Sequence, residues 1–220
     1  MYSVGGGVIG GVVGKLGVTG MEGFVKDQAG APYLDAGHPV TMEFLRTLAQ
    51  ELGMQVRAEV LPAEVLVRTP ELTAWWVPAA VRPLFFATTC DGKTLSGNSY
   101  PHPALVFSVE RGHLSVRALL ANERPGRNHP IAIAPYWNTD SNGGVCLGSM
   151  PVPERAGFEA LAGWVDGFFK SEFTHSNTAK LTNHPEGHLG LWRDLAGKDR
   201  FPIEWLVSAG TLEQWLCAHR

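Results

Sequence analysis

The chain has 220 residues and a formal net charge of −3, and 45% of its residues are hydrophobic, including seven tryptophans. This composition indicates a sizeable buried core, and it excludes global disorder and the basic face of a nucleic-acid-binding module. The chain has no apolar run of about 18 residues and no secretory signal pattern, so we expect no membrane association. Three cysteines without paired spacing favour a reducing, cytoplasmic location over a disulfide scaffold.

The N-terminal segment, residues 1–30, is rich in glycine. It contains a formal GxGxxG at Gly5, Gly7 and Gly10, which is the spacing of a dinucleotide-binding turn. That turn needs a strand before it and a helix after it, but too few residues precede Gly5 for a strand, and glycines continue after Gly10. Lys15 also lacks the neighbours of a phosphate-binding loop. The sequence therefore favours a flexible or irregularly paired hairpin, with no bound cofactor.

Residues 31–83 are predicted to be an N-terminal extension that packs on the core. Within it, the spacing of apolar residues predicts a helix over residues 41–52, with Thr41 as its cap. The adjacent tryptophans Trp75 and Trp76 follow. Large aromatic side chains are more typical of a core than of a ligand cage, so we interpret this pair as core residues.

Residues 84–175 are predicted to be the core domain, with an antiparallel meander of four strands followed by a helix. Apolar runs, alternation and turn residues predict strands at 84–90, 104–109, 114–120 and 131–137, and a helix over about 154–173. Residues 176–220 are predicted to be a C-terminal helical extension, rich in turns as far as Gly190 and with a last helix from about Thr211. A meander flanked by helices is an α+β fold.

Cys146 lies in the segment PYWNTDSNGGVCLGSM at residues 135–150. Taken alone it is a small hydrophobic residue between apolar neighbours, and free cysteines are often buried. Asn138, however, precedes it by eight positions at the end of the last predicted strand, with Gly143 and Gly144 between them. The spacing of Asn138 and Cys146 favours a functional cysteine over a structural one.

This part of the chain resembles the ubiquitin-conjugating superfamily, whose members carry an Asn at this distance before the catalytic Cys, then a turn with Gly and an apolar-Cys-Leu step. The residues that match are Asn138, Gly144, Val145, Cys146 and Leu147. From about residue 33 to its end, the chain is more specifically similar to prokaryotic family D of that superfamily, known as PRTRC system protein B. The motifs that carry this likeness are DAGHPVT at 35–41, WWVPAAVRPLFF at 75–86, HPALVF at 102–107, FFKSEFTH at 168–175 and FPIEWL at 201–206.

The resemblance implies a ubiquitin-conjugating-enzyme-like core in a bacterial protein, with Cys146 and Asn138 as the catalytic residues. Cys146 would carry a ubiquitin-like modifier as a thioester, and Asn138 would stabilise the oxyanion formed during transfer. The implied partners are a ThiF-like activating enzyme, a ubiquitin-like protein and a JAB-type metallopeptidase, in a system associated with plasmids. No cofactor is implied, because the activating enzyme uses the ATP. The chain departs from the family pattern where Tyr136 and Trp137 replace the usual His-Pro, and Asp140 is the nearest acidic residue for lysine deprotonation.

Two other functions stay open. In a Cys-His hydrolase, Cys146 would be the nucleophile and His175 its base. In a non-catalytic binding module, the fold would hold a ubiquitin-like protein without using the thiol. Within the conjugating interpretation, His175 is also a candidate proton shuttle beside the cysteine.

The remaining histidines and cysteines predict no further site. His184 and His188 with Glu186 form a polar cluster, but the Pro and Gly within HPEGH indicate a turn, and we expect no metal there. Cys90 and Cys217 are isolated in the sequence, and we interpret both as structural.

Overall fold

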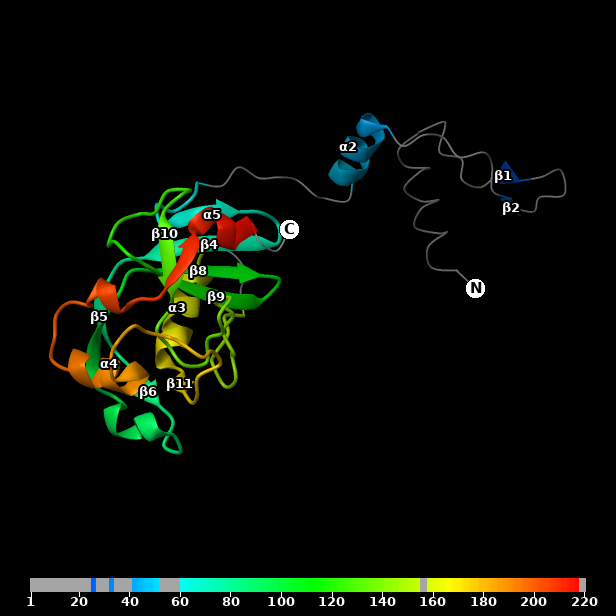
Figure 1. Cartoon of the computed structure of the whole chain (residues 1–220). Coiled ribbons are helices and arrows are strands. Elements are labelled where there is room, and N and C mark those ends of the chain that lie inside the picture. The colour runs from blue at the N-terminus through cyan, green and yellow to red at the C-terminus, as the bar shows by residue number, and fades with distance from the viewer. Residues whose placement is uncertain (1–24, 27–31, 34–40, 52–59, 155–157, 218–220) are drawn as a thin grey trace. The chain divides into compact units, whose positions relative to one another are not determined.

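Figure 1 shows the computed structural model of the chain, which describes residues 25–26, 32–33, 41–51, 60–154 and 158–217. The chain divides into two units, Met1–Val60 and Leu61–Arg220. In the first unit, β1 (Val25–Lys26) pairs antiparallel with β2 (Pro32–Tyr33), and α2 spans Met42–Glu51. The formal GxGxxG of the N-terminal segment lies outside the described residues.

The helix predicted over residues 41–52 is confirmed as α2. The Thr41 hydroxyl accepts a hydrogen bond from the backbone N–H of Phe44 at 3.1 Å, which satisfies one of the free donors of the first turn. Glu43 lies in the same turn, where the positive end of the helix dipole favours an acidic side chain. Local capping therefore determines where this helix begins.

The second unit is built on a six-stranded antiparallel sheet with the strand order β12-β10-β9-β8-β4-β3. Its strands are β3 (Val65–Arg68), β4 (Leu72–Val77), β8 (Leu105–Glu110), β9 (His113–Leu119), β10 (Pro130–Ile133) and β12 (Ser208–Thr211). The tight turn between β8 and β9 consists of Arg111 and Gly112, which both have a positive φ. This conformation matches the twist of the two flanking strands.

Both faces of this sheet are buried, because its side chains alternate between two hydrophobic clusters. On β8, Leu105 and Phe107 belong to the larger cluster and Val106 to the smaller one. The larger cluster includes the buried side of α3 (Ala160–Lys170), and the smaller one includes that of α5 (Leu212–Cys217). The sheet therefore lies between helices of the C-terminal part of the chain (Figure 1).

The structure is α+β with a mostly antiparallel sheet, but the four-stranded meander expected from the sequence is not confirmed. Three expected strands correspond to β8, β9 and β10, and the last of them ends at Ile133 instead of residue 137. The neighbour of β8 on its other side is β4, which contains Trp75 and Trp76. The tryptophan pair was expected in the core but not in a strand.

The apolar run 84–90, expected to be the first strand of the meander, does not join the main sheet. Only β6 (Phe85–Phe86) is extended within it, and β6 pairs in parallel with β11 (Glu172–Phe173). Leu84 and Phe86 are nevertheless buried. An apolar run indicates burial but does not say what covers it, which is why the strand prediction was wrong. The neighbouring elements are β5 (Ala80–Pro83), η1 (Asp91–Leu95) and β7 (Ser99–His102), with β5 paired to β7.

The C-terminal part contains more regular structure than the sequence predicted. The helix expected over 154–173 is observed only as α3, although residues 155–157 lie outside the described part. The stretch expected to be rich in turns holds the beginning of α4 (Gly187–Leu195), and η2 (Ile203–Trp205) follows. β12 then adds an edge strand to the main sheet before α5. No helix among the described residues is long and apolar enough to cross a membrane.

Tyr136 and His102 form a buried polar pair inside the larger cluster. The Tyr136 hydroxyl and His102 Nδ1 are 2.8 Å apart, and His102 Nε2 lies 3.2 Å from the carbonyl oxygen of Arg82. Burial lowers the pKa of His102 to about 3 and raises the pKa of Tyr136 well above its ordinary value. His188 stacks on the ring of Trp137, and burial lowers its pKa to about 4. Both imidazoles are therefore neutral in the folded chain near neutral pH.

We expect the free energy of unfolding to decrease as the pH is lowered below about 6.5. The unfolded chain protonates His102 and His188 near their ordinary pKa of 6.5, whereas burial keeps them neutral in the folded chain down to pKa values of about 3 and about 4. Their contribution is thus fully present above the unfolded pKa. It is lost on acidification at about 1.4 kcal/mol per pH unit for each imidazole.

Urea unfolding measured across this pH range tests the expectation. His188→Gln has one buried imidazole fewer. The slope of its free energy of unfolding against pH should therefore be smaller by about 1.4 kcal/mol per pH unit. The matched control is His113→Gln, which changes an exposed histidine at the start of β9 and should leave the dependence as in the wild type. Identical pH dependence in the wild type and in His188→Gln would contradict the assignment.

Candidate functional site

Cys146 lies in a short loop that returns from the end of β10 onto β9. The backbone N–H of Val145 donates to the carbonyl oxygen of Leu114 at 2.9 Å. The N–H of Val116 donates to the carbonyl oxygen of Gly143 at 2.8 Å. The segment before the cysteine is therefore held along β9 much as a short strand would be, while the side chain of Cys146 is exposed.

The Gly143-Gly144 pair is required by the tightness of this loop. Gly143 has a φ of +92°, and a Cβ on it would lie 2.8 Å from the carbonyl oxygen of Val116. A Cβ on Gly144 would lie 2.7 Å from Oδ2 of Asp140. The Asp140 carboxylate accepts hydrogen bonds from the backbone N–H groups of Asn142 and Gly144, at 2.7 and 3.0 Å. Asp140, the acidic residue nearest to Cys146 in sequence, is thus engaged in shaping the loop.

Asn138 connects the cysteine loop to the segment that follows α3. It has a φ of +60°, a left-handed conformation that Asn tolerates better than most residues. Its backbone N–H donates to the carbonyl oxygen of His175 at 2.9 Å, and its carbonyl oxygen accepts from the N–H of Cys146 at 2.8 Å. Its side-chain Nδ2 donates to the carbonyl oxygen of Glu172 at 3.0 Å. Its Oδ1 accepts from the N–H and the hydroxyl of Thr174, at 3.1 and 2.8 Å.

Tyr136 and Trp137, which stand where the resembling family has His-Pro, anchor the beginning of the site in the core. Tyr136 is 1% exposed and meets the ring of Phe168 edge to face, with 5.1 Å between the ring centroids. Trp137 stacks on His188 with the centroids 5.0 Å apart. The Thr139 hydroxyl donates to the carbonyl oxygen of Tyr136 at 2.6 Å. Aromatic packing therefore holds the chain at this point without the His-Pro step.

Arg117 and Trp215 hold the loop from the face of the sheet that α5 covers, and the sequence analysis missed both. Arg117 Nη2 donates to the carbonyl oxygen of Ser141 at 2.8 Å, and Trp215 Nε1 donates to that of Asn142 at 2.9 Å. The guanidinium of Arg117 lies 5.8 Å from the centroid of the Trp215 ring. Burial lowers the pKa of Arg117, and the nearby Asp140 opposes this shift. In an alternating strand, a buried Arg looks in sequence like an Arg that faces solvent. No local signal in the sequence therefore showed that Arg117 is buried.

The other two cysteines differ from Cys146 in their surroundings. Cys90 is half-buried, and its thiol lies 3.0 Å from the carbonyl oxygen of Ala87. Cys217 is exposed at the end of α5. Exposure alone therefore does not separate Cys146 from Cys217, whereas position in a constrained loop does.

The histidines singled out in the sequence have separate surroundings. His184 is buried, with its Nε2 3.1 Å from Oδ2 of Asp194. His188 lies in α4, where its Nε2 is 2.9 Å from Trp192 Nε1 and 3.0 Å from the carbonyl oxygen of Pro135. His175 is exposed, and its Nδ1 is 2.8 Å from the Thr174 hydroxyl oxygen. In the part of the chain that the structure describes, no three His, Cys, Asp or Glu side chains are grouped to hold a metal ion.

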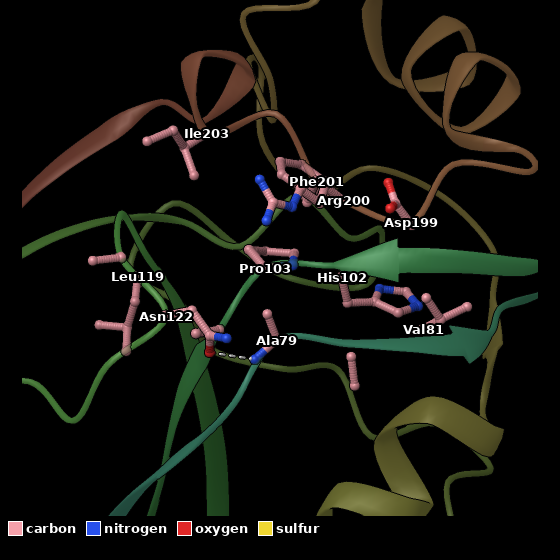
Figure 2. Close-up of a pocket in the computed structure, with 13 residues that line it drawn as sticks. Ala79, Val81, His102, Pro103, Leu119, Asn122, Asp199, Arg200, Phe201 and Ile203 are labelled. Carbon is pink, nitrogen blue, oxygen red and sulfur yellow. Dashed lines mark hydrogen bonds between the residues drawn. The ribbon is translucent and has the colours of Figure 1, made fainter.

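A cavity of about 500 Å³ is lined by residues of β5 and β7 and of the segment before η2. Figure 2 shows His102 among the residues that line this cavity. It also shows the hydrogen bond that the backbone N–H of Ala79 donates to Oδ1 of Asn122, at 2.9 Å. Neither Cys146 nor Asn138 lines it. The thiol of Cys146 is exposed and lies outside this cavity.

The model of prokaryotic E2 family D matches residues 41–209. No curated protein and no solved structure matches the chain. The matched range includes the cysteine loop, Asn138 and the segment around His175.

We expect Trp215→Phe to loosen the cysteine loop without unfolding the chain. Phenylalanine keeps an aromatic ring in the cluster around α5 but lacks the Nε1–H that donates to Asn142. Losing about 1 kcal/mol from one hydrogen bond should make the amides of residues 143–146 exchange with solvent about fivefold faster. Native-state hydrogen exchange measures this, with Trp205→Phe in η2 as the matched control. Equal exchange of these amides in both variants would contradict the anchoring role.

Proposed function

The chain belongs to prokaryotic E2 family D, and we propose that it accepts a ubiquitin-like protein as a thioester on Cys146 and passes it to an acceptor amine. The observation that carries the proposal is an exposed thiol on a constrained loop whose backbone is hydrogen-bonded to Asn138. A carrier thiol has to meet the C-terminus of a protein and the enzyme that activates it. An exposed position satisfies this need better than a cavity does.

Loading of Cys146 is a thiol exchange. The Cys146 thiolate attacks the carbonyl carbon of a thioester held by a ThiF-like activating enzyme, and a new C–S bond forms. The C–S bond to the activating enzyme breaks, and that enzyme's sulfur leaves as a thiolate. Gly143 and Gly144 allow the tight loop that carries the sulfur, because a Cβ on either would lie within 2.8 Å of an atom of Val116 or Asp140.

Discharge of the modifier to an amine passes through a tetrahedral oxyanion. Asn138 Nδ2 uses one hydrogen for the carbonyl oxygen of Glu172, and its second hydrogen has no acceptor among the described residues. That second hydrogen is the donor we assign to the oxyanion. Asn138 thus serves both to join two segments of the site and to stabilise the charge that develops on transfer.

The partners follow from the family resemblance together with the exposed thiol. They are a ThiF-like activating enzyme, a ubiquitin-like protein and a JAB-type metallopeptidase that would release the modifier again. We place them with this chain in a plasmid-associated PRTRC system of the bacterial cytoplasm. The open surface around Cys146 suits such protein partners.

A Cys-His hydrolase is the second candidate, and the surroundings of the Cys146 thiol disfavour it. In a hydrolase of this type the imidazole takes the thiol proton directly. In the described part of the chain Cys146 Sγ has no hydrogen-bond partner, and His175 Nδ1 is hydrogen-bonded to the Thr174 hydroxyl instead of to the sulfur. A non-catalytic binding module is a third candidate, but it has no use for an exposed thiol beside Asn138.

We expect the wild-type chain to form a covalent adduct with the ubiquitin-like protein, and reductant should cleave it. The adduct should appear in intact-mass analysis after incubation with the ThiF-like enzyme, the modifier and ATP. Cys146→Ala should abolish it, and Cys146→Ser should replace it with an ester that reductant does not cleave. Cys217→Ser, which changes another exposed thiol, is the matched control and should load normally. An adduct that survives in Cys146→Ala would rule out this carrier residue.

We expect Asn138→Ala to slow discharge much more than loading. Discharge needs a donor to the oxyanion, and loss of such a donor costs on the order of 100-fold in rate. Loading depends mainly on the thiolate and on docking of the activating enzyme. The measurement is single-turnover discharge of the preloaded adduct to a free amine. Asn138→Gly should be equally slow although it adopts a positive φ without strain, and recovery of the rate in that variant would show that only the backbone matters.

A further inference from the structure

The ring of His175 is oriented by hydrogen bonds that begin at Asn138. Oδ1 of an Asn side chain can only accept, so the Thr174 hydroxyl at 2.8 Å must donate its single proton to Asn138. The Thr174 oxygen is then the acceptor for His175 Nδ1, which lies 2.8 Å away. Nδ1 therefore carries the proton of the neutral imidazole. The lone pair of Nε2 is left free on an exposed side chain.

Backbone hydrogen bonds through Asn138 link the segment that carries this imidazole to the loop that carries the thiol. The carbonyl oxygen of His175 accepts from the backbone N–H of Asn138 at 2.9 Å. The carbonyl oxygen of Asn138 accepts from the backbone N–H of Cys146 at 2.8 Å. The backbone of Asn138 therefore connects the segment of His175 to the segment of Cys146. The side chains of His175 and Cys146 are both exposed, so each is open to an arriving acceptor.

The carboxylate nearest to Cys146 in sequence is already engaged elsewhere. Asp140 accepts two backbone N–H groups inside the loop and lies near the buried guanidinium of Arg117. Glu172 is exposed on β11 and is the competing carboxylate in the segment that Asn138 holds. Of Glu172 and His175, the two groups not engaged inside the loop, His175 alone has a side-chain hydrogen bond among the described residues, to the Thr174 hydroxyl.

We propose, on the basis of the proposed function, that His175 Nε2 is the general base that takes the proton from the acceptor amine. His175 Nε2 first takes one proton from the ammonium group, directly or through one water. The neutral amine nitrogen then attacks the thioester carbonyl carbon, and a C–N bond forms. The C–S bond breaks, and the second N–H proton passes to the Cys146 sulfur, which leaves as a thiol. The substrate class is a primary amine that is protonated at neutral pH, such as a lysine side chain.

The test compares two nucleophiles on the same preloaded adduct. Free lysine must lose a proton to attack, whereas hydroxylamine is already largely unprotonated at neutral pH. His175→Gln should slow single-turnover discharge to lysine by on the order of 100-fold, in line with the effect of a positioned base. Discharge of the same variant to hydroxylamine should stay within about twofold of the wild type, because that nucleophile needs no base before it attacks.

Matched variants separate a base from a structural residue. His113→Gln changes another exposed histidine and should discharge to both nucleophiles normally. Thr174→Ser keeps the hydroxyl that orients the ring and should discharge to both nucleophiles as the wild type does. If His175→Gln slowed discharge to lysine and discharge to hydroxylamine equally, the proposal would be overturned. A loss of lysine discharge in Glu172→Gln with none in His175→Gln would overturn it as well.

Loading is measured first, and it distinguishes the two hypotheses. If wild type forms no reductant-sensitive adduct, the proposed function fails, and the role of His175 fails with it. If His175→Gln loads normally and then discharges to lysine at the wild-type rate, only the role of His175 is overturned.

Discussion

The site depends on one residue in a left-handed conformation, Asn138, whose hydrogen bonds reach two separate segments. Its carbonyl oxygen holds the N–H of Cys146, while its N–H and side chain hold the chain from Glu172 to His175. A turn that needs a positive φ favours Asn over bulkier or β-branched side chains. The positive φ at this position favours a short side chain, and the proposed stabilisation of the oxyanion requires an amide N–H. Asn meets both requirements.

Rigidity around the cysteine comes from the core on one side and from a buried charge on the other. Tyr136 and Trp137 pack into the aromatic cluster that also buries two neutral histidines. Arg117 and Trp215 donate to carbonyl oxygens of the loop from the α5 face. Buried donors are costly to leave unpaired, so these bonds favour one arrangement of the loop. A thiol held in this way meets a partner without a prior ordering cost.

The exposed thiol separates two kinds of cysteine chemistry. A hydrolase has its base against the sulfur, whereas a carrier has to present the sulfur to successive proteins. In this chain His175 is held through Thr174 and Asn138, so its free nitrogen would be available to a group that arrives at the proposed thioester. The contact pattern fits acyl transfer to an amine better than it fits hydrolysis by a thiol-imidazole pair.

The sequence by itself determined the elements whose signals are local. Thr41 and apolar spacing predicted α2, and an apolar run and an alternating segment predicted β8 and β9. The catalytic roles that the spacing of Asn138 and Cys146 indicates stay predictions. Tertiary structure decided that the run 84–90 is buried outside the main sheet, that β4 joins β8, and that α4 begins within a stretch rich in turns. It also decided that Arg117 is buried and that Thr174 orients His175. Hydrophobic pattern records that a residue is buried, but the partner that buries or hydrogen-bonds it is set by chain segments far away in sequence.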